Sequence, residues 1–235
     1  MSAVNQIATM RLPNGKEVAF VDWSDKPLFS SADLRSGFTD ETVELFTYVA
    51  GDQVTATSNV TVRRTANDRD TNLSTPGAMA STEEMLVYAI KPEIFEQNAA
   101  VETPSDATTL EAREAGQPQP AGQRLSIAQE RLLISLNVSQ KIMHRAGFGY
   151  YNTGFGVFGS TVNRVTQGYP SQEAVRALTI PVHIGGQEKY RLTIENPDGT
   201  GVPIGNTSAT PPVETATVYF TVRVNLDGLY KRPVA

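Results

Sequence analysis

The chain has 235 residues, a formal net charge of −5, two histidines and no cysteine. Without cysteine, disulfide frameworks, cysteine-ligated metal sites and thiol nucleophiles are excluded. His144 and His183 have no partner at ligand spacing, so we interpret both as structural residues. The negative charge argues against a protein that coats nucleic acid, which needs clustered Lys and Arg. The sequence therefore predicts no enzyme, no cofactor and no metal site.

The N-terminal residues 1–10 lack the basic region and the apolar core of a signal peptide. No apolar run approaches the roughly 20 residues that span a bilayer. We therefore expect a protein that is made soluble and has no transmembrane segment.

In the first half of the chain, β-branched or alternating runs predict strands at Glu17–Asp22, Val54–Arg64 and Met85–Ile90. Short amphipathic runs at Asp40–Tyr48 and Lys91–Gln97 predict helices.

Residues 98–123 contain no aromatic residue and three prolines, so they contribute little to a core. We interpret them as a long flexible excursion or linker, with a short helix plausible at 105–116. Residues 1–117 carry 18 acidic and 9 basic residues, whereas 118–235 carry 7 and 11. We expect one compact unit over 1–235, with two small β-barrels at 1–97 and 124–235 as the alternative.

In the second half, Leu132–Met143 alternates imperfectly, and Ser171–Leu178 predicts a third helix. Thr179–Ile184 and Glu188–Glu195 are expected to form a hairpin around Gly185-Gly186, whose glycines would supply the positive φ of a tight turn.

The clearest strand is Thr215–Asn225, in which Val218, Phe220, Val222 and Val224 share one face. Turn signals follow strands at Asn196–Gly199 and Leu226–Gly228. Some ten strands with frequent turns indicate an all-β fold, an antiparallel β-sandwich or jelly roll with a few short helices.

The segment Gly147–Gly159 combines five glycines with the five aromatic residues Phe148, Tyr150, Tyr151, Phe155 and Phe158. Its G-x-G-x-x-G match at 154–159 is not followed by a helical pattern, so we reject a dinucleotide site. Two interpretations stay open: a kinked core strand with its rings inside, and an exposed loop that packs on another subunit.

Two other patterns resemble functional sites, a calcium loop and a pair of carboxylates, but lack the residue spacing that such sites need. Asn67–Asn72 carries Asp68, Asp70 and Asn72, yet the glycine and the bidentate glutamate of a calcium loop are missing. Glu83 and Glu84 are adjacent at the entry to a predicted strand, so they point to opposite faces and cannot share a proton.

The C-terminal residues Tyr230, Lys231 and Arg232 open a charged tail after the last strand. The tail is either a frayed terminus or an arm that reaches a neighbouring subunit.

In overall texture the chain resembles virion structural proteins of bacteriophages, of the jelly-roll capsid type. The resemblance rests on the cysteine-free β pattern rich in Thr, Val, Gly and Pro, on the 98–123 insertion, on the glycine–aromatic stretch and on the terminal strand. It implies a subunit without catalytic activity that assembles with copies of itself and with other virion proteins, in the virion. A membrane or DNA beneath the shell is left open, and no sequence-specific nucleic-acid binding is implied.

The residues we expect at a subunit interface are Phe148, Tyr150, Tyr151, Phe155, Phe158, Tyr230, Lys231 and Arg232. A different class of function is a monomeric carbohydrate- or receptor-binding module of a phage tail or secreted particle, in which Tyr150, Tyr151 and Phe155 form a ligand platform. A hydrolase built from distant carboxylates is a third alternative.

Overall fold

A computed structural model of the chain describes residues 9–11, 15, 17–19, 23–35, 42–55, 63–98, 129–151, 176–197 and 218–231. Its elements are β1 (Thr9–Arg11), β2 (Glu17–Ala19), β3 (Trp23–Asp25), β4 (Leu28–Arg35), β5 (Val43–Leu45), β6 (Gln53–Thr55), β7 (Arg63–Thr65), β8 (Glu84–Asn98), β9 (Leu133–Val138), β10 (Lys141–Gly147), the 3-10 helix η2 (Phe148–Tyr151), β11 (Ala177–Ile184), β12 (Tyr190–Glu195) and β13 (Val218–Lys231). The expected all-β class is confirmed.

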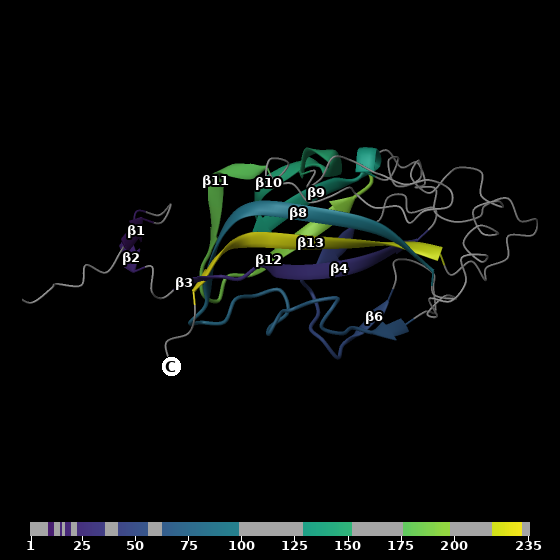
Figure 1. Cartoon of the computed structure of the whole chain (residues 1–235), viewed down its shortest axis with the longest axis horizontal. Helices are drawn as coiled ribbons and strands as arrows, with labels where there is room; N and C mark the ends of the chain where they lie inside the picture. Colours follow the sequence, from purple (N-terminus) through teal and green to yellow (C-terminus); the bar gives the residue numbers. More distant parts are fainter. Residues whose placement is uncertain are drawn as a thin grey trace, which may run out of the picture.

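Two antiparallel sheets form the body of the molecule (Figure 1). One sheet has the order β10-β9-β12-β5. The other has the order β11-β8-β13-β3, and β4 also pairs with β13. Since β3 pairs with residues 229–231 of β13 and β4 with residues 219–226, β3 and β4 share one position beside β13. Two small hairpins, β1–β2 and β6–β7, lie outside these sheets.

The strand pairs are nested along the chain. β4 pairs with β13, β5 with β12, β8 with β11, and β9 with β10. If β3 and β4 count as the first strand and the β1–β2 and β6–β7 hairpins are set aside, the first strand pairs with the last, the second with the next to last, and so on inward. Both sheets therefore draw strands from residues 1–97 and from residues 124–235, and the acidic and basic halves of the sequence do not form separate lobes in the described residues.

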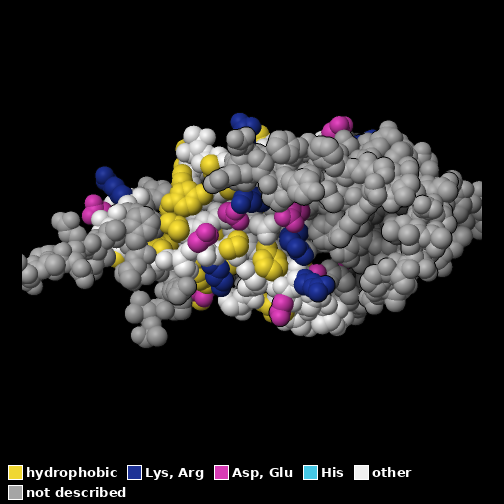
Figure 2. All heavy atoms as spheres, in the orientation of Figure 1, with side chains coloured by type: hydrophobic (Ala, Val, Ile, Leu, Met, Phe, Trp, Pro, Cys, Tyr) yellow, Lys and Arg dark blue, Asp and Glu magenta, His cyan; other side chains and the backbone are white. Residues whose placement is uncertain are grey.

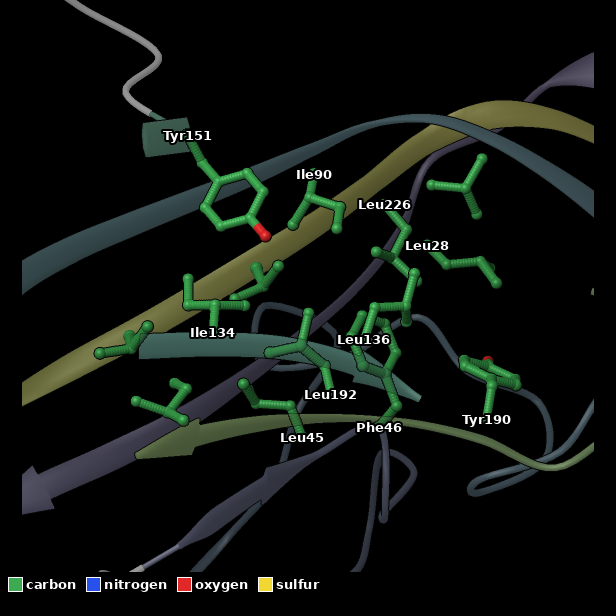
Figure 3. Packing of buried hydrophobic residues seen from close by; sticks show 14 of the residues in the cluster. Leu28, Leu45, Phe46, Ile90, Ile134, Leu136, Tyr151, Tyr190, Leu192 and Leu226 are labelled. Atoms are coloured by element: carbon green, nitrogen blue, oxygen red, sulfur yellow. The ribbon is translucent and has the colours of Figure 1, made fainter. Parts of the chain in front are cut away.

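The core lies between the two sheets (Figure 3). Leu28, Ile90 and Leu226 come from one sheet, and they face Ile134 and Leu192 of the other. All five side chains are at most 3% exposed. Period-two alternation explains this arrangement, because every second residue of a strand points to the same face.

Both helices expected in the first half are wrong. β5 occupies Val43–Leu45 with alternating buried and exposed residues, and β8 runs through Lys91–Gln97. Amphipathic runs this short fit the helical and the strand periodicity equally well. Here β5 pairs with β12, and β8 pairs with β13, so both runs are extended. Proline has no backbone N–H to donate to a neighbouring strand. Pro92 is tolerated because β11 pairs with β8 only as far as Ala89, so beyond that residue β13 is on one side of β8 and no described strand pairs with the other side. The third expected helix is also wrong where it is described, since 177–178 belong to β11.

Several strands are confirmed with changed boundaries. Glu17–Asp22 is a strand over its first three residues, Met85–Ile90 is the start of β8, and Thr215–Asn225 is a strand from Val218 onward. Val54–Arg64 is not one strand, because its two ends pair with each other as β6 and β7.

Leu132–Met143 contains a hairpin, β9–β10. Its connecting residues Ser139 and Gln140 both have positive φ, 48° and 67°, as a type I′ turn requires.

The expected hairpin around Gly185-Gly186 is wrong. β11 lies in the sheet of β8, whereas β12 lies in the sheet of β9. The positive φ belongs to Gln187, at 65°. Gly186 is needed for another reason: a Cβ there would lie 2.5 Å from the Ser81 carbonyl oxygen. The chain passes from one sheet to the other here, and glycine permits the close backbone approach.

The expected turn at Leu226–Gly228 is also wrong, because β13 continues through it to Lys231. The register with β8 shifts between Asp227 and Gly228. A Cβ on Gly228 would lie 2.0 Å from the Leu86 carbonyl oxygen, so only glycine fits this bulge. The predictions for 99–123 and 154–159, and for the Asp198 and Gly199 part of the expected 196–199 turn, lie outside the described residues.

Candidate functional site

The described part of the glycine–aromatic stretch begins at the end of β10 and continues into η2. The Phe148 backbone N–H donates to the Leu132 carbonyl oxygen at 2.8 Å, which fixes the start of the helix against the residue that immediately precedes β9. A 3-10 helix has three residues per turn, so Phe148 and Tyr151 lie on the same side. Both are buried in the core, at 2% and 1% exposure, whereas Tyr150 is 39% exposed. The core interpretation therefore applies to two rings of this stretch, and Tyr150 lies at the surface.

A hydrogen bond holds Tyr151 to β10. The Tyr151 hydroxyl lies 2.6 Å from Nδ1 of His144. Burial raises the pKa of Tyr151, with the neighbouring Tyr150 adding to the shift, and burial lowers the pKa of His144. Both shifts favour the neutral pair, in which the hydroxyl donates to Nδ1 of the imidazole tautomer protonated at Nε2. His144 thus has a structural partner.

Tyr150 is held in place on the surface by its neighbours. Its ring makes an edge contact with Tyr151, with centroids 5.3 Å apart, and the Arg176 guanidinium carbon lies 4.1 Å from its ring centroid. Arg176 immediately precedes β11, so this cation–π contact links η2, which follows the edge strand β10 of one sheet, to the start of the edge strand β11 of the other. Together with Ile142 and Met143, which are 54% and 40% exposed, Tyr150 forms what we call the β10 rim.

The expected C-terminal interface residues are parts of the sheet. Tyr230 and Lys231 end β13, where they pair with β3 and β8. Tyr230 is 5% exposed, and its pKa is raised by burial and by its hydrogen bond to Glu83. Lys231 donates to Glu84 at 2.8 Å. Both residues are anchored within the chain, and Arg232 lies outside the described residues together with Phe155 and Phe158.

The paired carboxylates separate as strand geometry requires. Glu84 contacts Lys231 and His183, with its Oε2 3.2 Å from Nε2 of His183. Glu83 instead raises the pKa of Tyr190 and Tyr230, after the larger effect of burial. The two carboxylates therefore serve different contacts.

The Asn67–Asn72 loop is tied to β4, where Thr71 forms an antiparallel bridge with Ser30. The Asp70 carboxylate accepts from the Asn67 backbone N–H at 3.0 Å. The Asn72 side chain accepts from the Phe29 N–H and donates to the Pro27 carbonyl oxygen. These groups shape the loop against β4. Within the described residues, no group of three or more His, Asp or Glu is arranged to hold a metal ion.

A second exposed apolar region, which we call the outer patch, was not anticipated. It consists of the exposed Tyr88 and Ile180 together with a small cluster in which Trp23 and Leu86 are buried and Leu229 is partly buried. Figure 2 shows hydrophobic side chains gathered over β11 and the adjoining end of β8. The available signal was Trp23, the single tryptophan of the chain, but the five residues come from four strands whose pairing the sequence does not reveal.

No described helix is long and apolar enough to cross a membrane. Comparison with known protein families, curated proteins and solved structures finds no significant match.

Proposed function

We propose that the chain is a non-enzymatic virion structural protein, a jelly-roll capsid subunit of a bacteriophage that assembles with copies of itself. The observation that carries the proposal is the nested pairing of β4 with β13, β5 with β12, β8 with β11, and β9 with β10. This is the pairing expected when one long antiparallel hairpin is wrapped into two sheets, as in jelly rolls.

The interior supports a scaffold rather than a barrel that encloses a ligand. Jelly rolls also occur in lectin and cupin domains, so the fold by itself is an analogy. Here the inner faces are filled by aliphatic side chains such as Ile134, Leu136 and Leu226, each fully buried. A solid sandwich of this kind presents its chemistry on outer faces, rims and terminal segments, which are the surfaces that subunits of a shell use.

Both exposed apolar regions support self-association. The β10 rim and the outer patch include the five large apolar side chains with the greatest exposure in the described chain, Tyr88, Ile142, Met143, Tyr150 and Ile180. Aromatic and aliphatic anchors of this kind are enriched at interface centres. The partners we propose are copies of the chain and other virion proteins, with no cofactor and no sequence-specific nucleic acid.

Sedimentation velocity tests this function with the purified full chain. We expect species larger than the monomer to appear as concentration rises. We expect their size to depend on ionic strength, because the strands that carry the exposed regions also carry ion pairs, Arg145 of β10 with Glu195 and Lys231 of β13 with Glu84. A monomer at all ionic strengths and at high protein concentration would contradict the proposal.

The alternative function, a monomeric binding module, is favoured by one observation. Tyr150 presents an exposed ring that Arg176 and Tyr151 hold in place, as a ligand platform needs. Tyr151 is buried, so it is not available to such a platform. Replacing Tyr150, Phe155 and Phe158 by Ala separates the two functions: an assembly subunit loses its oligomeric state, whereas a binding module keeps its state and loses its ligand.

A further inference from the structure

The two sides at which the sheets end are built differently. On one side, β5 ends the four-stranded sheet, and β4 lies in the last position of the five-stranded sheet. The Phe46 backbone N–H, directly after β5, donates to the Ser30 hydroxyl oxygen of β4 at 3.0 Å, and Ser30 also forms an antiparallel bridge with Thr71. Hydrogen bonds therefore tie the two sheets together here. We call β5, β4 and the adjoining residues 46–48 and 67–72 the closed edge.

On the other side, β10 ends the four-stranded sheet and β11 ends the five-stranded sheet. Within the described residues, no strand pairs with their outer sides and no backbone hydrogen bond joins them. They are linked by side chains, because the guanidinium of Arg176, just before β11, lies over the ring of Tyr150 in η2, just after β10. This contact places the two edge strands beside each other, as Figure 1 also shows. We call β10, η2, Arg176 and β11 the open edge.

Exposed apolar side chains gather on the open edge. Of the five large apolar side chains with the greatest exposure in the described chain, Ile142 and Met143 belong to β10, Tyr150 to η2 and Ile180 to β11. The fifth, Tyr88, lies on β8 opposite the register shift of β11. The closed edge has no side chain of this kind among its described residues. The apolar surface of the sandwich is thus concentrated where the sheets are not tied together by backbone.

Irregular pairing makes the open edge a surface of side chains. Register shifts interrupt β10 after Ile142 and β11 between Ala177 and Val182. Pro181, within the β11 shift, has no backbone N–H to donate. Bulges and proline hinder the addition of a further strand to a sheet. A partner therefore contacts the side chains of the open edge and does not extend its backbone ladder.

The open edge has the size of a protein–protein interface. β10, η2 and β11 contribute 7, 4 and 8 residues. A stable interface takes about 20 to 30 residues from each partner. Aromatic residues and methionine are enriched at interface centres, and Tyr150 and Met143 are of these types. A second protein surface of similar extent therefore fits the open edge, whereas a small ligand would leave most of it exposed.

The charges of the open edge are basic. Arg145 is neutralised by Glu195 of β12, at 2.7 Å. Lys141 and Arg176 form no ion pair with a described carboxylate. When two identical edges meet, these cations approach their copies, so added salt should strengthen the contact by screening the repulsion. An acidic partner would instead be bound more weakly as salt rises.

We propose that two copies of the chain pair through their open edges around a twofold axis. This pairing rests on the proposed self-assembly and names the surface that forms its dimer. The contact is isologous, because the same surface of both copies takes part, and it ends at two copies. The closed edge and the outer sheet faces stay available for the further contacts of a larger assembly.

Sedimentation equilibrium of the full chain tests the pairing. Ile142→Asp and Ile180→Asp each place a charge on the open edge, and Thr47→Asp places the same charge on an exposed residue of the closed edge. We expect the dissociation constant of the dimer to rise at least about tenfold in each open-edge variant, because the charge loses its water on pairing. For Thr47→Asp we expect a change within about twofold. Circular dichroism checks that each variant is folded.

A bulky label supplies a second test that does not depend on folding of an Asp variant. The chain has no cysteine, so Ile142→Cys and Thr47→Cys each offer one thiol that a polyethylene glycol maleimide modifies after folding. The label at position 142 should prevent dimerisation, whereas the label at position 47 should leave the dimer intact. For the parent chain, raising the salt should lower the dissociation constant of the dimer.

Assemblies that persist with the open-edge charges and with the label at position 142 would overturn the pairing and leave the proposed function standing. A dimer of the parent chain that weakens as salt rises would also overturn the pairing, because it would indicate a contact between oppositely charged surfaces. A chain that stays monomeric at every concentration would overturn both the pairing and the proposed function, and would assign the open edge to a partner other than a copy.

Discussion

The outer patch and the β10 rim both expose apolar side chains beside a bulge and a glycine, yet they are built differently. In the outer patch, a Cβ on Gly228 would collide with the β8 backbone, and the buried indole N–H of Trp23 has no acceptor in the described chain. In the β10 rim, a Cβ on Gly147 would meet no atom within 4 Å, and Tyr150 is backed by Arg176 and Tyr151.

The difference teaches that glycine density in a sequence does not locate the glycines that the fold requires. Gly147 begins the stretch that attracts attention in the sequence, but its position has room for a side chain. Gly228 looks like part of a turn in the sequence, but it lies where the central strands β8 and β13 approach too closely to admit a Cβ.

The largest expected effect comes from filling the outer-patch bulge. Gly228→Ala places a methyl group against the Leu86 carbonyl oxygen, so β8 and β13 must separate. We expect a loss on the order of 4 kcal/mol in the free energy of unfolding, because backbone on both sides resists relaxation. Urea denaturation measures it, with Gly147→Ala as the matched control, for which we expect a change within about 1 kcal/mol. Equal losses in the two variants would remove the distinction between the regions.

The next effect concerns the hydrogen bond behind the β10 rim. Tyr151→Phe removes the hydroxyl and leaves Nδ1 of His144 without this partner. We expect a loss of about 1–2 kcal/mol in the free energy of unfolding. Tyr150→Phe is the control, since its ring is exposed, and should change stability by less than about 0.5 kcal/mol. A Tyr151→Phe variant as stable as the parent chain would contradict the structural role of the pair.

The same pair predicts a pH dependence. Burial holds the pKa of His144 below its ordinary value of 6.5, so the unfolded chain binds the proton more readily than the folded chain. Stability is therefore full above about pH 6.5 and falls as the pH drops from there toward the folded pKa. We expect a fraction of the roughly 1.4 kcal/mol per pH unit that one proton can contribute, because the ring is partly exposed.

His144→Gln keeps a hydrogen-bond acceptor and removes the titration. Thermal unfolding between pH 5 and pH 7.5 should show a smaller pH slope for this variant than for the parent chain. An unchanged slope would assign the pH dependence to other groups.

The last prediction compares two surface substitutions that should hardly change stability but should change association to different extents. Ile180→Ser and Ile142→Ser replace exposed isoleucines of the outer patch and the β10 rim, and each should change the free energy of unfolding by about 0.5 kcal/mol or less. We expect Ile180→Ser to lower the weight-average mass in sedimentation equilibrium more than Ile142→Ser does, because Ile180 is the more exposed of the two, at 75% against 54%. The reverse pattern would assign the main association contact to the β10 rim.

Strands were predictable where alternation and β-branched residues agree, as at Met85–Ile90 and Val218–Asn225. The helix expected at Asp40–Tyr48 is wrong. A run as short as Val43–Leu45 fits the helical and the strand periodicity, and only its pairing with β12 makes it a strand.

Strand pairing could not be predicted for the same physical reason. The β11 and β12 strands look like one hairpin, but each finds its partner far away in the chain, at β8 and β9. The outer patch depends on that long-range register, so no local pattern announces it. Three of the residues expected at a subunit interface, Phe148, Tyr151 and Tyr230, are instead buried in the core between the two sheets. Their burial depends on the same long-range pairing of strands.

We propose that this sandwich is a subunit of a closed assembly. Electron microscopy of the purified full chain, at the concentrations used for sedimentation, tests it most directly. We expect rings or shells of repeating subunits, and we expect an Ile180→Asp variant to lose them. Dispersed single particles of monomer size at every concentration would contradict it.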